Sequence, residues 1–355
     1  MSIFMVDVAG LELLPIERKL LALPQISAVI LFTRNFNNLA QLRALIAEIR
    51  ALRADLFIAV DHEGGVVQRF TRHGFKQLPA ACVYGEVYDF NQEAGLYLAQ
   101  QYGQYMACDL LEVGVDISLA PVLDVHDDQS AVIGRLDRAF HSNPQAVSAL
   151  AHAFIQGMHL AGMPCVAKHF PGHGRIVYDS HLTRPVHDQP VDNELNIFAD
   201  LIKHHQLDAI MPAHVTYELI DAHYPAGFSP IWLDDILRRK LQFNGLIISD
   251  CLSMSGADIG DLPTRAFKAL HAGCDMLIVC NQPRQFMYDF VQNKRFVSED
   301  ASLRRLHAFK QKMRRFHQAC YHAANVMPPT RLTSAPYADE PQSYKKSKLN
   351  TTQSV

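Results

Sequence analysis

The 355-residue sequence contains no Cys-x-x-Cys pair, although seven cysteines are scattered along it. An odd number of widely spaced cysteines argues against a disulfide framework and against a structural zinc site. The chain also lacks the run of about 20 apolar residues that a membrane-spanning helix needs, and no basic segment precedes an apolar one near its N-terminus. We therefore expect a cytoplasmic protein without a secretory signal or a membrane contact.

An excess of charge of one sign is missing as well. The 33 Lys and Arg residues nearly balance the 36 Asp and Glu residues, which leaves a net charge of -3. This balance argues against nucleic acid or an anionic membrane as the main partner. Apolar residues make up 49% of the chain, enough for a large buried core, so the chain as a whole is not disordered.

Two nucleotide-binding signatures are absent, because no Gly-x-Gly-x-x-Gly follows the first strand-like segment and no P-loop occurs. Short apolar runs are present instead, each followed by a segment with helical periodicity. They have the near-continuous apolar character of buried parallel strands, and they are Ile3–Val8, Ala28–Phe32, Leu56–Val60, Val115–Leu119, Cys165–Ala167, Ala209–Met211, Leu246–Ser249 and Met276–Cys280. The alternation predicts an α/β fold, a single TIM (β/α)₈ barrel; a doubly wound sheet would alternate in the same way.

Capping residues predict several helix boundaries. Asn143-Pro144 begins a helix that Gly162 ends, and Ser229-Pro230 begins another that Gly245 ends. From residue 327 the chain is rich in Pro, Ser, Thr and Lys and poor in large aliphatic residues. We therefore expect two parts, a barrel domain over residues 1–326 and a disordered or loosely packed polar tail over residues 327–355.

Polar side chains follow the predicted strands at the end where a barrel places its chemistry. They are Asp7, Arg34, Asn35, the segment Asp61-His62-Glu63-Gly64-Gly65, Asp124, Lys168, His169, His214, Asp250 and Asn281. Taken singly, an aspartate at a strand end more often caps a helix or pairs with an arginine than it catalyses. Their convergence on one rim predicts a functional site.

The segment Lys168–Gly174, followed by Asp179-Ser180-His181, combines a cation, a Pro-Gly turn and three histidines. A metal site is one interpretation, since His169 and His173 have the spacing of ligands on a helix. The Pro-Gly pair between them disfavours a helix, and no His-Glu-x-x-His motif occurs, so no metal is expected. A lysine at a strand end is also a candidate Schiff-base nucleophile, which leaves a lyase as an alternative.

The motifs KHFPGHG and DSH, with VDHEGGVVQRF before them and GLIISDCLSM after them, resemble family 3 glycoside hydrolases. Within that family the chain looks like the bacterial cytoplasmic β-N-acetylhexosaminidases of peptidoglycan recycling. FTRN, APVLDV, FSPIWL and HAGCDM extend the similarity in the same order, from about residue 3 to residue 285. The resemblance implies a TIM barrel without the second domain that many family members carry.

Catalytic and binding roles follow from the resemblance. It implies that Asp250 is the nucleophile and that His181 is the general acid/base, oriented by Asp179. The implied sugar-binding residues are Asp61, Arg69, Arg138, Lys168 and His169. Arg135 is an alternative to Arg138, because this segment reads IGRLDRAF where the family has the shorter IGxRSF. A second departure is Cys251, which replaces a family aspartate and would leave Asp250 with a lower pKa.

These roles fit the chemistry of a retaining glycosidase. A histidine titrates near neutral pH and can both donate and accept the proton, and Asp179, two residues before His181, can face it in an extended segment. Gly172 and Gly174 suggest that the loop with both residues moves during turnover.

The implied activity is a retaining exo-β-N-acetylglucosaminidase that releases N-acetylglucosamine from GlcNAc-1,6-anhydroMurNAc-peptides through a covalent glycosyl–Asp250 intermediate. The implied partner is this small carbohydrate substrate, no organic cofactor is expected, and the chain is expected to be a monomer. Water and phosphate both stay open as acceptors. The competing interpretations are the Lys168 lyase, a metal hydrolase using His169, His173 and Asp250, and a catalytically silent sugar-binding protein.

Overall fold

The computed structural model describes residues 3–176, 184–292, 296 and 299–326, and for 317–326 it describes the backbone alone. Contacts divide the chain into two units, Met1–Cys320 and Tyr321–Val355. The predicted tail, 327–355, lies outside the described residues, so the two-part division stays a proposal.

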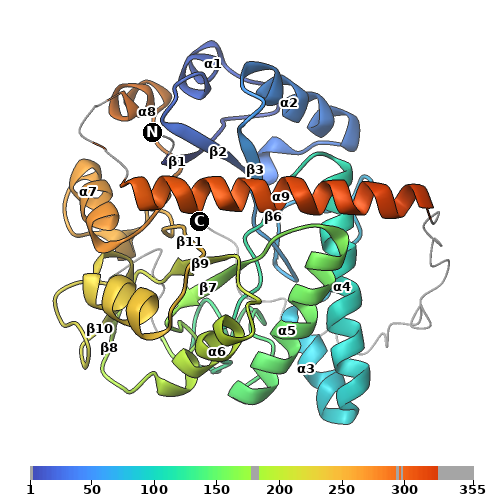
Figure 1. The fold of residues 1–355 in the computed structure, drawn as a ribbon, viewed down its shortest axis with the longest axis vertical. Coiled ribbons are helices and arrows are strands. Elements are labelled where there is room, and N and C mark those ends of the chain that lie inside the picture. The colour runs from blue at the N-terminus through green and yellow to red at the C-terminus, as the bar shows by residue number, and fades with distance from the viewer. Residues whose placement is uncertain (1–2, 177–183, 293–295, 297–298, 327–355) are drawn as a thin grey trace, which may run out of the picture. The chain divides into compact units, whose positions relative to one another are not determined.

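Strands form at every one of the predicted apolar runs. They are β1 (Phe4–Asp7), β2 (Ile26–Leu31), β3 (Phe57–Val60), β6 (Ile117–Ser118), β7 (Val166–Phe170), β9 (Ala209–Pro212), β11 (Leu246–Ile247) and β12 (Leu277–Val279). They make two parallel sheets, in the orders β12-β1-β2-β3-β6 and β11-β9-β7 (Figure 1). Isolated parallel bridges also pair Val122 with Lys168 and Ile248 with Met276. The α/β prediction is therefore confirmed.

Two further strand pairs were not predicted, because runs of two or three residues are too short to give a pattern. The pairs are β4 (His62–Gly64) with β5 (Val67–Gln68), and β8 (Val186–His187) with β10 (Thr216–Tyr217). Both pairs lie in the connections that follow strands of the parallel sheets.

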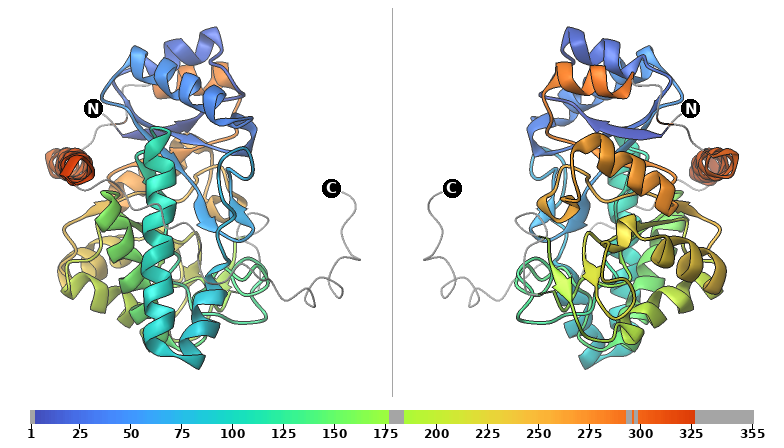
Figure 2. Two further views of the ribbon diagram at one scale, coloured as in Figure 1. Left: turned by 90° about the vertical axis from the view of Figure 1, so that its right-hand side faces the viewer. Right: turned by 90° about the vertical axis from the view of Figure 1, so that its left-hand side faces the viewer.

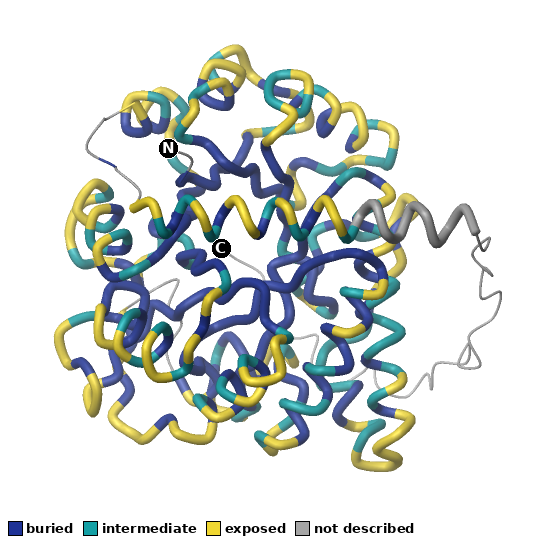
Figure 3. The backbone as a smooth tube through the Cα atoms, viewed as in Figure 1, coloured by how far each residue is buried: buried dark blue, intermediate teal, exposed yellow. Residues whose placement is uncertain are grey.

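Helices follow the strands, and the apolar face of each helix packs on the strands. The strands are therefore mostly buried, whereas the outer faces of the helices are exposed (Figure 3). They are α1 (Pro15–Leu21), α2 (Leu39–Leu52), α3 (Ala81–Phe90), α4 (Gln92–Glu112), α5 (Pro144–Ala161), α6 (Asp192–Lys203), a π-helix (Ile231–Lys240), α7 (Leu262–Ala272), α8 (Arg284–Val291) and α9 (Asp300–Val326). None of the described helices is long and apolar enough to span a membrane.

The capping residues predicted both ends of one helix correctly, but the predicted end of a second helix was wrong. The Asn143 side chain accepts a hydrogen bond from the backbone N–H of Gln145 at 2.8 Å, and Gly162 ends α5 with a φ of 91°. The prediction that Gly245 ends the helix after Ser229-Pro230 was wrong, since that helix ends at Lys240. A Cβ on Gly245 would lie 2.4 Å from the carbonyl oxygen of Asp208, so close backbone approach explains this glycine.

The helix α9 crosses the ends of the strands where they begin. Its Leu306, Phe309 and Met313 pack in one cluster with strand residues that include Met5 and Phe57. Ion pairs join Arg305 to Asp275 at 2.7 Å and Lys310 to Asp55 at 3.7 Å. In the side views, α9 is seen end-on across the strands from the β4–β5 and β8–β10 pairs (Figure 2). The opposite ends of the strands are thereby left for the site.

Candidate active site

A pocket of about 400 Å³ opens at the carboxyl ends of the parallel strands. Six of the predicted site residues line it together: Asp61, Arg69, Arg138, Lys168, His169 and Asp250. The predicted pair Asp179 and His181 lies outside the described residues, as does the loop for which we expect movement. Phe32, Met254 and Asn281 add apolar and amide surface to the same lining. The pocket therefore combines charged groups with hydrophobic walls, as ligand sites commonly do.

Lys168 is the central cation of the pocket. It comes from β7, is almost fully buried, and its ammonium contacts Asp61 at 2.8 Å and Glu63 at 2.6 Å. Burial alone would lower the pKa of Lys168, but the two carboxylates outweigh it and raise that pKa. Burial likewise opposes the ionisation of Asp61, yet Lys168 and Arg69 hold its pKa below the usual range. Lys168 is thus a fixed positive charge.

Glu63 is a site residue for which the sequence predicted a place at a strand end but no role. Both of its oxygens accept hydrogen bonds from Arg138, from Nε and Nη2 at 2.8 Å each. Burial opposes the ionisation of Glu63, but Arg138 and Lys168 together lower its pKa far below the usual value. Arg138 lines the pocket, whereas the alternative Arg135 is exposed and does not. The signal for Glu63 was its place in the polar segment Asp61–Gly65, directly after a predicted strand.

Asp124 organises the turn after β7. Its carboxylate accepts hydrogen bonds from the His169 ring Nδ1 at 2.7 Å and from the backbone N–H of His173 at 2.6 Å. Although burial favours the neutral acid, His169 and these hydrogen bonds lower the pKa of Asp124. A buried carboxylate thus fixes both the ring of His169 and the path of the chain after it.

Gly172 and Gly174 are explained by close packing within this turn. Gly172 has a φ of 149°, and a Cβ there would lie 2.5 Å from that of Glu194. A Cβ on Gly174 would lie 1.7 Å from the carbonyl oxygen of Val125. Side chains are therefore excluded at both positions by neighbouring atoms, a reason that is independent of any loop movement.

Asp250 follows β11 and enters the pocket with Cys251. Its Oδ1 accepts a hydrogen bond from the Cys251 backbone N–H at 2.7 Å. His214 is buried nearby and stacks on Phe228, with ring centroids 5.1 Å apart. Burial lowers the pKa of His214, and Asp250 opposes that shift. Asp250, which follows β11, thus lies close to the buried ring of His214 and is hydrogen-bonded to the backbone of Cys251.

Some strand-end residues have structural roles instead. Asp7 is fully buried, forms an ion pair with Arg34, and receives Arg284 at 2.8 Å. The Asn35 side chain donates to the carbonyl oxygens of Val8 and Gly10. For these residues the ordinary interpretation, pairing and capping, accounts for the side chains.

His62 gives a stability prediction. It lies buried between Phe70 and Phe75, and burial, together with Arg69, lowers its pKa to about 3. An unfolded histidine has a pKa of about 6.5, so between these values only the unfolded chain binds the proton. The free energy of unfolding therefore falls as the pH decreases across this window, and His62 contributes about 1.4 kcal/mol per pH unit.

His62→Phe should flatten this pH dependence, because the ring packing stays while the titrating group is lost. Denaturant unfolding of both proteins at several pH values within the window measures the difference. His223→Phe is the control, since His223 is exposed. Equal slopes for wild type and His62→Phe would contradict the assignment.

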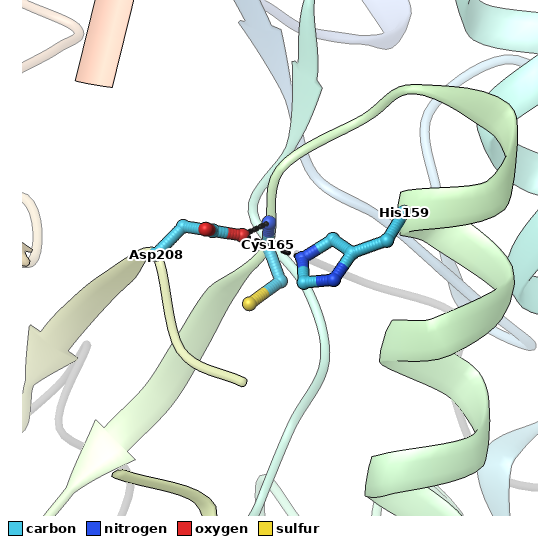
Figure 4. A group of neighbouring side chains, drawn as sticks. All are labelled: His159, Cys165 and Asp208. Atoms are coloured by element: carbon cyan, nitrogen blue, oxygen red, sulfur yellow. Dashed lines mark hydrogen bonds and ion pairs between the residues drawn. The ribbon is translucent and has the colours of Figure 1, made fainter. Parts of the chain in front are cut away.

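One group of potential metal ligands occurs in the described part of the chain, at the other ends of the strands. His159, Cys165 and Asp208 place one ligand atom each within 4.8 Å of one another. The Asp208 carboxylate accepts from the Cys165 backbone N–H at 2.8 Å and contacts His159 Nε2 at 2.7 Å (Figure 4). Lys312 of α9 also pairs with it. The negative charge of Asp208 is thus balanced by protein groups, and its carboxylate anchors α9.

Comparisons with known proteins give a consistent result. Residues 5–309 match the model of the glycosyl hydrolase family 3 N terminal domain. A beta-hexosaminidase of Thioalkalivibrio sulfidiphilus is 52% identical over 289 residues, which are 79% of this chain and 81% of that protein. One of Idiomarina loihiensis is 52% identical over 287 residues, 79% of this chain and 84% of the other.

Among solved structures, NagZ from Neisseria gonorrhoeae in complex with N-trifluoroacetyl-D-glucosamine is 40% identical. It superposes with a TM-score of 0.82, covering 92% of this chain and 94% of that one.

Proposed function

The chain belongs to glycoside hydrolase family 3 and is a hydrolase of the beta-hexosaminidase type, and on that premise we propose that it is a retaining exo-β-N-acetylglucosaminidase. The observation that carries the proposal is the single pocket in which Asp250, Lys168, His169, Asp61, Arg69 and Arg138 meet. The neighbour from Neisseria gonorrhoeae, which was solved with an N-acylated glucosamine, supports the choice of sugar.

We also propose that the strands close into one (β/α)₈ barrel. The two isolated bridges support this, because Val122–Lys168 lies between β6 and β7, and Ile248–Met276 lies between β11 and β12. Added to the two sheets, these bridges would join the strands into one circuit. In a barrel the pocket occupies the usual position for catalysis, at the carboxyl ends of the strands.

In the proposed mechanism, the Asp250 carboxylate attacks the anomeric carbon of N-acetylglucosamine and forms a covalent glycosyl ester. Its attack requires an ionised oxygen directed into the pocket, and Asp250 enters the pocket directly from the end of β11. Water then releases the sugar with the original β configuration. Proton NMR of the first product formed tests this stereochemistry, and initial release of the α anomer would exclude the proposed intermediate.

The other charged groups would bind the sugar. Lys168 offers donors, Asp61 offers acceptor oxygens, and the guanidinium groups of Arg69 and Arg138 add further donors. Because Glu63 and Asp124 hold Arg138 and His169 by hydrogen bonds, the binding groups are positioned before substrate arrives. Such a site suits the hydroxyl groups of a pyranose.

A Schiff-base reaction at Lys168 is disfavoured by the same contacts. A nucleophilic lysine needs a neutral amine, and enzymes obtain one by lowering the lysine pKa. Here Asp61 and Glu63 raise the pKa of Lys168 against the effect of burial. The ammonium therefore stays charged, which fits hydrogen bonding to hydroxyl groups.

His181 is proposed as the general acid/base, with Asp179 orienting it. His181→Ala should lower kcat/KM by roughly 100-fold or more for substrates with poor leaving groups, which need protonation. Aryl glycosides with good leaving groups should lose far less. A Brønsted plot of rate against leaving-group pKa measures this, with the exposed His271→Ala as the control. Equal losses across the series would remove His181 from the acid role.

The natural substrate proposed is GlcNAc-1,6-anhydroMurNAc-peptide from cell-wall turnover, used by a monomer in the cytoplasm. The deciding assay is release of the chromophore from a chromogenic β-N-acetylglucosaminide. Binding of N-acetylglucosamine without release would indicate a silent sugar-binding protein, and loss of release on treatment with a chelator would indicate a metal hydrolase.

A further inference from the structure

Two cysteines lie together in the wall of the pocket, beside the proposed nucleophile. Cys251 follows Asp250 directly, and Cys280 follows the last residue of β12. Both line the pocket. Cys280 is buried in the apolar cluster between the strands, and Cys251 packs against the same cluster while remaining partly exposed. Both cysteines are thus part of the pocket wall.

The backbone holds the two segments in register. The bridge between Ile248 and Met276 brings them together, and the Leu252 N–H donates to the Ile278 carbonyl oxygen at 2.9 Å. The Ser253 hydroxyl donates to the Cys280 carbonyl oxygen at 2.8 Å. Neighbouring strands lie about 4.8 Å apart, and the Cα atoms of disulfides lie about 4.4–6.8 Å apart. The two cysteines therefore lie on adjoining segments, and their thiols are in hydrogen-bonding contact.

The thiols also differ in reactivity. Hydrogen bonding with Cys280 lowers the pKa of Cys251, although burial opposes it. The same contact, together with burial, raises the pKa of Cys280 well above the usual value. Cys251 is thus the better thiolate of the two, and Cys280 can act as its resolving partner.

We propose that Cys251 and Cys280 are an oxidation site at which a peroxide forms a disulfide in the pocket wall and switches the enzyme to a low-activity state. The Cys251 thiolate attacks one peroxide oxygen, the O–O bond breaks, and the other oxygen leaves as hydroxide. The Cys280 thiol then attacks the sulfenic sulfur, the S–O bond breaks, and water leaves. Two thiols lose two electrons and hydrogen peroxide becomes two waters.

Loss of activity follows from the position of Cys251, and this half of the inference rests on the proposed function. Joining the sulfurs pulls the backbone of Cys251 towards β12. That backbone N–H donates to the Asp250 carboxylate at 2.7 Å, so the carboxylate moves with it. A displacement near 1 Å at a reacting group costs about 100-fold in rate.

The other described cysteines are poorer candidates. Burial raises the pKa of Cys82 to about 11 and that of Cys165 well above the usual value. Cys274 is also buried, and its pKa is raised for the same reason. Cys108 is exposed and should react with a peroxide, but it does not line the pocket. It therefore provides the matched control.

The test treats the full chain with hydrogen peroxide, then compares activity on the chromogenic substrate with non-reducing peptide mapping. Each variant is scaled to its own untreated activity. We expect wild type and Cys108→Ser to lose activity by about 100-fold, to recover it with dithiothreitol, and to yield a Cys251–Cys280 cross-linked peptide. Cys280→Ser should form no cross-link and should retain a Cys251 sulfenic acid that dimedone traps.

A wild-type map without the Cys251–Cys280 peptide would overturn the inference. A cross-link that leaves activity unchanged would overturn the switch, and so would inactivation of Cys251→Ser and wild type to the same extent. If the untreated protein has no glycosidase activity, the proposed function fails, while the cross-linked peptide still establishes the oxidation site.

Discussion

Replacing Asp250 with alanine is expected to lower kcat for the chromogenic β-N-acetylglucosaminide on the order of 10,000-fold or more. The reason is that the covalent route needs an ionised oxygen at the anomeric carbon, and alanine supplies none. The loss should fall on kcat, whereas affinity for N-acetylglucosamine should change little, because Lys168, Arg69 and Arg138 stay in the lining. Steady-state kinetics and calorimetric titration with the sugar separate the two quantities.

Asp258→Ala is the matched control, because this aspartate is exposed, pairs with Arg265 at 2.7 Å and is not part of the pocket. Its kcat should stay close to that of wild type. A slow fluoro-sugar substrate should label Asp250 in the wild-type protein, as read by peptide mapping. Label on a different carboxylate, or an active Asp250→Ala protein, would exclude Asp250 as the nucleophile.

The second large effect is expected on stability, at Glu63. Glu63→Ala leaves Arg138 without its two-point partner and takes one of two carboxylates from Lys168. Uncompensated charges in a buried position cost about 3–5 kcal/mol of folding free energy. Denaturant unfolding at neutral pH measures the loss.

Glu112→Ala provides the comparison, because Glu112 pairs with Arg43 on the surface, where an ion pair is worth about 0–1 kcal/mol. The double variant Glu63→Met/Arg138→Met should recover part of the loss, since an apolar pair removes the orphaned charge. If Glu63→Ala and Glu112→Ala were equally stable, the buried network would not have the importance assigned to it.

The positions of the strands, and of several residues that line the pocket, were predictable for a common reason. Buried parallel strands are continuous apolar runs, and the residues that follow them, such as Lys168, His169 and Asp250, mark where the runs stop. One local pattern in the sequence therefore predicts both where a strand lies and which side chain stands at its end.

Partnerships between distant residues were not predictable in this way. Glu63 and Arg138 are 75 positions apart, and Asp124 and His169 are 45 apart, so neither pair forms a local pattern. The resemblance supplied Arg138 without its partner. Likewise, the pairing of Cys251 with Cys280 depends on the register of β11 against β12, which only the folded chain displays.

The contacts of α9 allow the stability of the protein to be changed separately from its pocket. Its Leu306, Phe309 and Met313 close the strand ends that face away from the pocket, and Arg305 and Lys310 anchor it to aspartates there. Thermal stability can therefore be raised by redesigning the contacts between α9 and the strands. The residues that line the pocket, at the opposite ends of the strands, need not be changed.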